Sequence, residues 1–414
     1  MSTTNLYRGL FELLTLPHGD AVSEMLLTSG RIARRELLVI ARQESCLPEL
    51  YARWAAESLL SPAESAEHEQ FVRRRASVAE LLRALPAGTL LAGAEALRSA
   101  AAAVEVLLPD FAAIGPLHEA VQGLGYRLRD AGEWLVPLRG PMHRGLASFR
   151  YTAALPGAIA IDVQVGGVPM AARRNLAFAD LSARPTRLEG LPCVTLAPAA
   201  QMLHRIAAFG ARETPVTVRE IADLHLLLKD AAQRVDPAWL QGKVEQLDAW
   251  AGLRQLREAI VAKRLGALLS WGEFGRLVES SATRGEVAPK QRPREPRVAA
   301  IVRNAFSLVE GPRQDDVTAK LARAPWLVSR VLAAGHRVRG VPVSSKVFDA
   351  PRFVRIDGAL YLATGAGLIL LSLVDLGEVA RGGLGERVRT GSRPVVLARW
   401  SAAPSARRSS ARAS

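Results

Sequence analysis

The positive charge of this chain is confined to its last third. Residues 1–262 contain 28 basic and 28 acidic side chains, whereas residues 263–414 contain 26 basic and 12 acidic ones, so the whole excess of +14 lies there. The segment from Ser280 to Arg297 is rich in Pro, Arg and Glu and lacks apolar periodicity, which is typical of a linker. The sequence therefore predicts a neutral body joined to a smaller basic one.

The composition favours ordered globular domains in a reducing compartment. Of the 414 residues 49% are hydrophobic, which is enough for a substantial core and excludes wholesale disorder. Cys46 and Cys193 are the two cysteines, so a disulfide scaffold and a four-cysteine zinc site are both excluded. The amino terminus lacks the pattern of a signal peptide, and we expect a cytoplasmic protein.

The longest uncharged run indicates buried strands rather than a membrane span. Residues 358–374 form this run, and it is shorter than the roughly 20 residues that a spanning helix needs. It also contains Gly365 and Gly367 in its interior, and it begins in a hairpin-like pattern at Asp357-Gly358. We expect no transmembrane segment.

Apolar residues at three- and four-residue spacings predict helices at both ends of the neutral body. The predicted helical ranges are Ile32–Leu59, interrupted near Pro48, then Ala66–Leu85, Ala199–Phe209, Thr217–Leu228 and a helix that starts at Asp236-Pro237.

The pattern between these helical parts is that of a small sheet. The predicted strands are Thr89–Ala92, Val104–Leu108, Tyr126–Arg129, Trp134–Leu138, Ala147–Ala154 and Ala158–Val165. Gly93 ends the first of them, and helices are expected over Ala94–Ala102 and Phe111–Leu124.

The expected fold class is α+β. In chain order we predict a helical N-terminal segment (1–87), a small mixed-sheet core (88–195), a helical segment (196–282), a linker (283–297), a small basic α+β domain (298–402) and a disordered basic tail (403–414).

Three short stretches in the predicted sheet have a recognisable pattern. They are Leu91-Ala92-Gly93-Ala94-Glu95-Ala96-Leu97, Ala103-Val104-Glu105-Val106-Leu107-Leu108-Pro109-Asp110 and Ile161-Asp162-Val163. Together with the helical lead Leu37–Arg42 and the later helices Leu196–His204 and Ile221–Leu228, they resemble the nucleotidyltransferase superfamily of DNA polymerase β-like fold. The resemblance covers about Arg31 to Ile260 and is closer to the bacterial group called nucleotidyltransferase family proteins.

This resemblance implies an NTP as substrate and Mg²⁺ as cofactor. In the family a glycine turn presents backbone N–H groups to the nucleotide phosphates, and strand carboxylates hold two Mg²⁺ ions. Carried over by position, Gly93 and Ala94 match the phosphate turn, and Glu105 and Asp162 match metal ligands and catalytic residues. The implied activity is Mg²⁺-dependent transfer of a nucleoside monophosphate to an acceptor that the sequence does not identify.

The motif departs from the family at three positions, which leaves two functions open. Ala103 stands where the first strand aspartate belongs, Ala94 offers no hydroxyl, and Ala92 replaces a lysine of many relatives. Either the protein is a nucleotidyltransferase, or it is a pseudoenzyme that keeps the fold as a scaffold or partner-binding protein. In the second case Glu105 and Asp162 are solvent-facing strand residues.

Other polar residues have simpler interpretations. His204, Asp223 and His225 are interpreted as helix-packing or locally hydrogen-bonded residues. The tail Ala403–Ser414 could contact an acidic protein, a nucleic acid or an anionic lipid through its arginines, or it could serve solubility alone. No aromatic residues alternate with these arginines, which favours the solubility interpretation over nucleic-acid binding.

Overall fold

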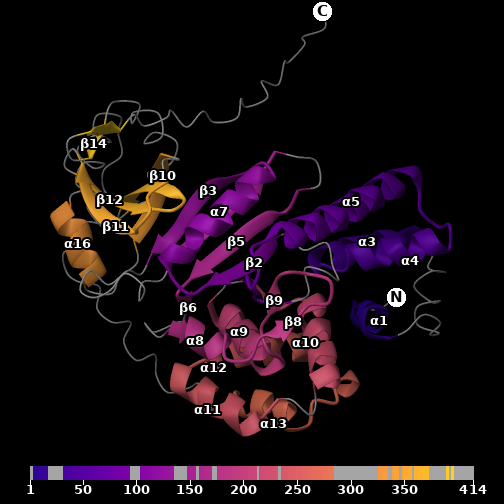
Figure 1. Ribbon diagram of the computed structural model, residues 1–414. Coiled ribbons are helices and arrows are strands. Elements are labelled where there is room, and N and C mark those ends of the chain that lie inside the picture. The colour runs from indigo at the N-terminus through magenta and orange to yellow at the C-terminus, as the bar shows by residue number, and fades with distance from the viewer. Residues whose placement is uncertain are drawn as a thin grey trace, which may run out of the picture. The chain divides into compact units, whose positions relative to one another are not determined.

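The computed structural model describes the greater part of the chain (Figure 1). The described residues are 3–16, 31–93, 103–134, 147–154, 158–169, 175–211, 214–231, 235–283, 325–333, 338–344, 347–356, 359–372, 388–390 and 393–395. The helix expected over 94–102, the predicted linker from residue 284 onward and the tail 403–414 lie outside them.

Internal contacts divide the chain into two compact units. The first comprises residues 1–109, 120–127 and 151–294, and the second comprises residues 110–119, 128–150 and 295–414. The domain boundaries expected from the sequence stay predictions.

Four helices open the first unit: α1 (Thr3–Thr15), α3 (Arg31–Gln43), α4 (Leu47–Ala56) and α5 (Pro62–Ala84). The break expected near Pro48 is present, because α3 ends at Gln43 and Pro48 lies in the first turn of α4, where its missing N–H costs no helical hydrogen bond.

The long helix α5 has a complete start signal. The Glu64 N–H donates to Ser61 Oγ, and the Ser61 N–H donates to Glu64 Oε2 at 2.8 Å, which forms a capping box just before Pro62. The helix ends at Ala84, next to Leu85 and Pro86, as the sequence predicts, but it begins at Pro62 instead of the predicted Ala66 because the capping box lies there.

A mixed sheet of seven strands follows in the described residues, in the order β3-β4-β5-β2-β1-β9-β8. The strands are β1 (Leu90–Leu91), β2 (Ala103–Leu108), β3 (Tyr126–Trp134), β4 (Ala147–Ala153), β5 (Ala160–Val165), β8 (Thr186–Arg187) and β9 (Val194–Thr195). Strand β1 is antiparallel to β2 and parallel to β9, while β2 and β5 are parallel.

The elements beside this sheet are short. They are the 3₁₀ turn η1 (Phe111–Ala113), helix α7 (Ile114–Gly123), the two-stranded sheet of β6 (Gly167–Pro169) and β7 (Asn175–Ala177), and helix α8 (Phe178–Leu181). One expectation is corrected here: β3 is a single strand from Tyr126 to Trp134, so Trp134 ends that strand instead of starting a new one. Residues 135–138 lie outside the described residues.

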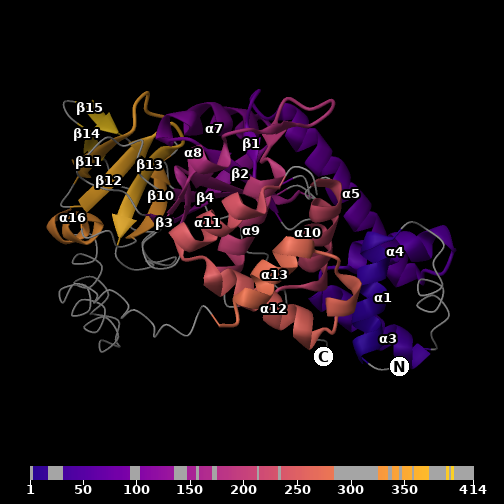
Figure 2. The same ribbon diagram turned by 90° about the horizontal axis from the view of Figure 1, so that it is seen from below.

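A layer of helices completes the first unit (Figure 2). It contains α9 (Pro198–Ala211), α10 (Val218–Ala231), α11 (Pro237–Leu247), α12 (Trp250–Ala262), the 3₁₀ turn η4 (Gly266–Leu268) and α13 (Gly272–Ser280). Helices α9 and α12 approach closely at Gly210 and Gly252, since a Cβ atom on Gly252 would lie 1.9 Å from the Ile206 carbonyl oxygen.

One hydrophobic core joins these parts of the first unit. It includes Trp54 of α4, Leu107 of β2, Leu203 of α9 and Leu253 of α12, all nearly inaccessible to solvent. Because Leu107 is in this core, the face of β2 that carries Leu107 is turned toward the helical layer.

The second unit contains a four-stranded antiparallel ladder in the order β11-β12-β13-β10. Its elements are α16 (Pro325–Ala333), β10 (Val338–Ser344), β11 (Arg352–Ile356), β12 (Ala359–Thr364) and β13 (Gly367–Ser372), with a small hairpin of β14 (Val388–Thr390) and β15 (Arg393–Val395). Ile356 pairs with Ala359, which agrees with the predicted two-residue hairpin.

The uncharged run of the sequence supplies β12 and β13, and every residue of both strands is buried. Among the described residues, no helix combines the length and the apolar character that crossing a bilayer requires.

Candidate functional site

The two predicted acidic residues lie side by side in the sheet. Strands β2 and β5 are parallel neighbours, and Glu105 is the register partner of Asp162. Each acidic residue lies between two buried apolar neighbours on its strand. These neighbours are Val104 and Val106 beside Glu105 on β2, and Ile161 and Val163 beside Asp162 on β5. Since register partners in a ladder project to the same face, both carboxylates point to one side of the sheet.

The predicted glycine turn lies beside the same pair. The backbone N–H of Ala92 donates to the Glu105 carbonyl oxygen at 3.0 Å, so Gly93 follows directly at the end of β1, next to β2. Ala94 lies outside the described residues. The structure thus brings Gly93, Glu105 and Asp162 together on three adjacent strands, while the roles expected of them stay predictions.

Ala103 leaves one end of this arrangement apolar. It is the register partner of Ala160, and both share a face with the acidic pair. The Ala103 methyl group therefore stands where the resemblance would place the first strand aspartate, and the Ala160 methyl group lies beside it.

A histidine from the helical layer completes the polar cluster. His204 Nε2 of α9 lies 3.2 Å from Glu105 Oε1, and the His204 side chain is 6% exposed whereas that of Glu105 is 37% exposed. Burial alone would raise the pKa of Glu105, but the charge and hydrogen bond of His204 and the charge of Arg205 together hold that pKa below its ordinary value. Glu105 is therefore a carboxylate at neutral pH.

The pairing of His204 with Glu105 is the feature that reasoning from the sequence missed. Helix α9 is buried on more than one side, because four consecutive residues have almost no exposure to solvent. They are Gln201, Met202, Leu203 and His204. A buried histidine on such a helix needs a polar partner inside the protein. A histidine on a buried helix therefore predicts that some polar partner is present. No pattern in the sequence identifies that partner as Glu105, 99 residues earlier.

An ion pair and a hydrogen bond connect helices of the helical layer. Arg205 of α9 lies 3.8 Å from Asp223 of α10, with both side chains 13% exposed. His225 accepts a hydrogen bond at Nδ1 from Trp271 Nε1 at 3.3 Å. Both contacts agree with the interpretation of Asp223 and His225 as helix-packing residues.

Further from the sheet, the loop between α3 and α4 carries a buried carboxylate. Glu44 Oε1 contacts Lys263 Nζ at 2.5 Å, and Glu44 Oε2 accepts the Val218 N–H at the start of α10 at 2.6 Å. Nearby, Arg219 of α10 forms an ion pair with Glu49 of α4. These pairs join the N-terminal helices to the helical layer.

Neither cysteine is suited to act as a nucleophile. Both thiols are buried, and burial raises the pKa of Cys46 and of Cys193. Since the thiolate is the reactive form, both are structural residues.

The acidic pair has the chemistry to hold part of the coordination shell of a nucleotide-borne Mg²⁺. Mg²⁺ binds oxygen ligands and is commonly held by one or two carboxylates together with substrate phosphates, a set that Glu105 and Asp162 can supply in part. In the described parts of the chain, no group of three or more His, Cys, Asp or Glu residues could hold a metal ion.

Comparisons with known proteins add no relative. No protein-family model, no curated protein and no solved structure matches the chain.

Proposed function

We propose that this protein binds a nucleoside triphosphate with Mg²⁺ beside Glu105 of β2, Asp162 of β5 and Gly93 at the end of β1, and transfers the nucleoside monophosphate to an acceptor. The observation that carries the proposal is the direct register of Glu105 with Asp162 on parallel strands. The position of Gly93 beside the pair, at the end of β1, supports it. The resemblance of the surrounding motifs to nucleotidyltransferases supplies the reaction class.

In this proposal the two carboxylates have one role. Glu105 and Asp162 would hold the Mg²⁺ that accompanies the phosphates, and the backbone at Gly93 would approach the phosphate chain without a side chain in the way. When bound there, the ion would stabilise the negative charge that develops on the phosphates. The acceptor oxygen forms a bond to the α-phosphorus, the bond to the pyrophosphate oxygen breaks, and the acceptor proton passes to solvent.

His204 acts through Glu105. Its position 3.2 Å from Oε1 orients the carboxylate and favours its ionised form, which is the form that binds a cation. His204 is therefore a positioning residue in this proposal.

A second candidate function is a non-catalytic scaffold that keeps a nucleotide pocket or binds a partner. Two observations favour it: Ala103 and Ala160 present methyl groups beside the acidic pair, and one oxygen of Glu105 is already in contact with His204. Fewer available carboxylate oxygens stabilise less transition-state charge.

Release of pyrophosphate from labelled NTPs in the presence of Mg²⁺ tests the first proposal. Asp162→Asn removes a metal ligand and should lower the rate at least about a hundredfold. Asp248→Asn is the matched control, because Asp248 is exposed and has a left-handed backbone that asparagine tolerates.

The outcomes separate the two candidates. Release that survives in Asp162→Asn at the wild-type rate contradicts the assignment of this site. Mg²⁺-dependent NTP binding without release favours the scaffold. A wild-type protein that binds no NTP contradicts the nucleotide site altogether.

A further inference from the structure

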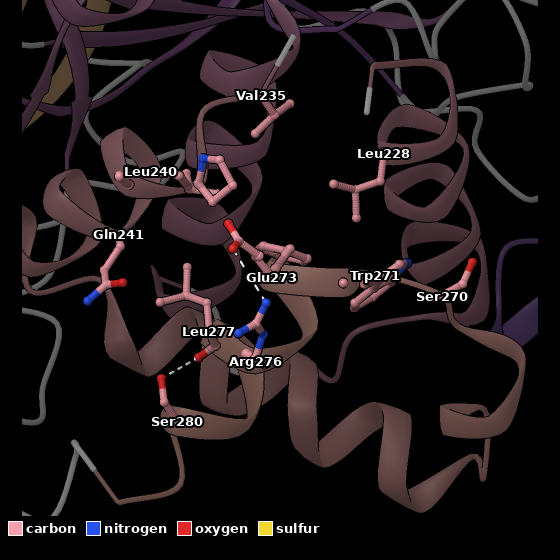
Figure 3. A pocket seen from close by; sticks show the side chains of 14 residues that line it. Leu228, Val235, Leu240, Gln241, Ser270, Trp271, Glu273, Arg276, Leu277 and Ser280 are labelled. Carbon is pink, nitrogen blue, oxygen red and sulfur yellow. Dashed lines mark hydrogen bonds and ion pairs between the residues drawn. The ribbon is translucent and has the colours of Figure 1, made fainter. Parts of the chain in front are cut away.

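A cavity of about 700 Å³ lies within the helical layer of the first unit, between α10, α11 and α13 (Figure 3). Its volume is in the range of about 300–1,000 Å³ that is usual for small-molecule sites. More than half of the residues that line it are apolar, and they include Leu228, Val235, Leu240, Trp271, Phe274 and Leu277. Glu105 and Asp162 are not among the residues that line it, so the cavity is distinct from the acidic pair.

The charged groups among the described lining residues are exposed to solvent. Glu273 and Arg276 line the cavity, and Figure 3 shows them paired; Arg276 Nη2 lies 3.4 Å from Glu273 Oε1, and both side chains are more than half exposed. Asp236, next to the lining residue Pro237, accepts the N–H groups of Ala238 and Trp239 at 2.9 and 3.3 Å. An ionised group placed against the apolar walls would lose water without gaining a counterion from those walls, which makes its binding unfavourable.

Two polar side chains of the walls already have partners within the protein. Gln241 donates to Glu245 Oε1 at 3.1 Å, and the Ser280 hydroxyl donates to the Leu277 carbonyl oxygen at 2.8 Å. A ligand in the cavity would therefore make mainly apolar contacts with the walls.

Contacts within the helical layer fix the position of the apolar side chains that line the cavity. The Trp271 indole N–H donates to His225 Nδ1, and the Trp271 ring lies 5.3 Å from the Phe274 ring, centroid to centroid. Leu240, Trp271 and Phe274 also belong to the hydrophobic core. A ligand would thus meet a preformed surface and would not need to order it, which lowers the entropic cost of binding.

We propose that this cavity is a binding site for a neutral, mainly apolar small molecule. The size, the apolar walls, the exposure of the charged pair Glu273 and Arg276 to solvent and the support of Trp271 by its neighbours together favour this class of ligand. The inference is independent of the nucleotide site, since it uses none of the same residues.

Calorimetric titration with three naphthalene probes of one shape tests the ligand class. They are 2-naphthamide, which is neutral, 2-naphthoate, which is an anion, and 2-(aminomethyl)naphthalene, which is a cation at neutral pH. We expect saturable one-to-one binding of 2-naphthamide and at least about tenfold weaker binding of both ions. Equal affinity for the charged probes, or no saturable binding of any probe, overturns the proposal.

Two tryptophan variants of α11 test the location. Gln241 lines the cavity and is exposed at its mouth, so Gln241→Trp should obstruct it and weaken 2-naphthamide binding at least about tenfold. Gln246 is exposed on the same helix and is not a lining residue, so Gln246→Trp should retain binding within about twofold. Equal effects of the two variants place the probe elsewhere and contradict the site. Because both substitutions are made at exposed positions, the variants should fold, and circular dichroism checks this.

Discussion

The buried pair of Glu44 and Lys263 should be one of the strongest local determinants of stability in the first unit. Both side chains are about one-tenth exposed, and the carboxylate also accepts the first N–H of α10. Lys263→Met removes the ammonium group and leaves the Glu44 carboxylate buried without its counterion. Glu44→Gln leaves the ammonium group with the face of the Tyr7 ring, 4.8 Å from its centroid.

The expected cost follows from the burial of both groups. Breaking a buried ion pair by removing one partner costs about 3–5 kcal/mol, because the remaining charge keeps its desolvation penalty. With a urea m value of about 3 kcal/mol/M, a loss of that size moves the unfolding midpoint down by about 1–1.7 M. The double variant Glu44→Gln with Lys263→Met has no unpaired charge, so it should be about 1–3 kcal/mol more stable than the sum of the single losses indicates.

Urea unfolding followed by circular dichroism at neutral pH measures these differences in all four proteins of the cycle. Arg73→Met is the control, since Arg73 and Glu69 are 4.0 Å apart and more than half exposed, and a surface pair contributes under about 1 kcal/mol. A loss below about 1 kcal/mol in Lys263→Met, or strict additivity in the double variant, would refute the reasoning.

The remaining perturbations are expected to change the stability of the protein in different directions. Gly252→Ala should destabilise the protein by several kcal/mol in urea unfolding, because its Cβ would meet the Ile206 carbonyl, whereas Gly242→Ala, at a helix position with open space around it, should stabilise by about 0.5–1 kcal/mol. Ser61→Ala should cost about 1 kcal/mol through the lost cap of α5, and an unchanged midpoint would contradict the capping box. Burial and the charge of Lys229 lower the pKa of His225, so the unfolded chain binds a proton more readily and stability should fall as the pH drops below about 6.5. Comparing unfolding at about pH 7.5 and about pH 5.5 checks this, and His225→Gln should reduce the pH dependence.

The local elements of this protein are largely determined by its sequence. Pro86 marks the end of α5, and the alternation of Ile161 and Val163 with polar residues defines β5, so spacing within a few residues predicts both features. The predicted start of α5 is too late, because the Ser61 and Glu64 capping box places it at Pro62 rather than at Ala66. The single strand β3 departs from expectation because pairing of a strand with its neighbours can extend it through positions of weak local preference.

The arrangement of the candidate site was decided by tertiary structure. Glu105 and Asp162 were recognisable as acidic strand residues, but their direct pairing depends on the parallel register of two strands that are 57 residues apart. The contact of His204 with Glu105 and the burial of Glu44 against Lys263 join segments that are more distant still. Side-chain periodicity determines which face of an element is buried, whereas the partner that a buried charge meets there is determined by how the elements pack.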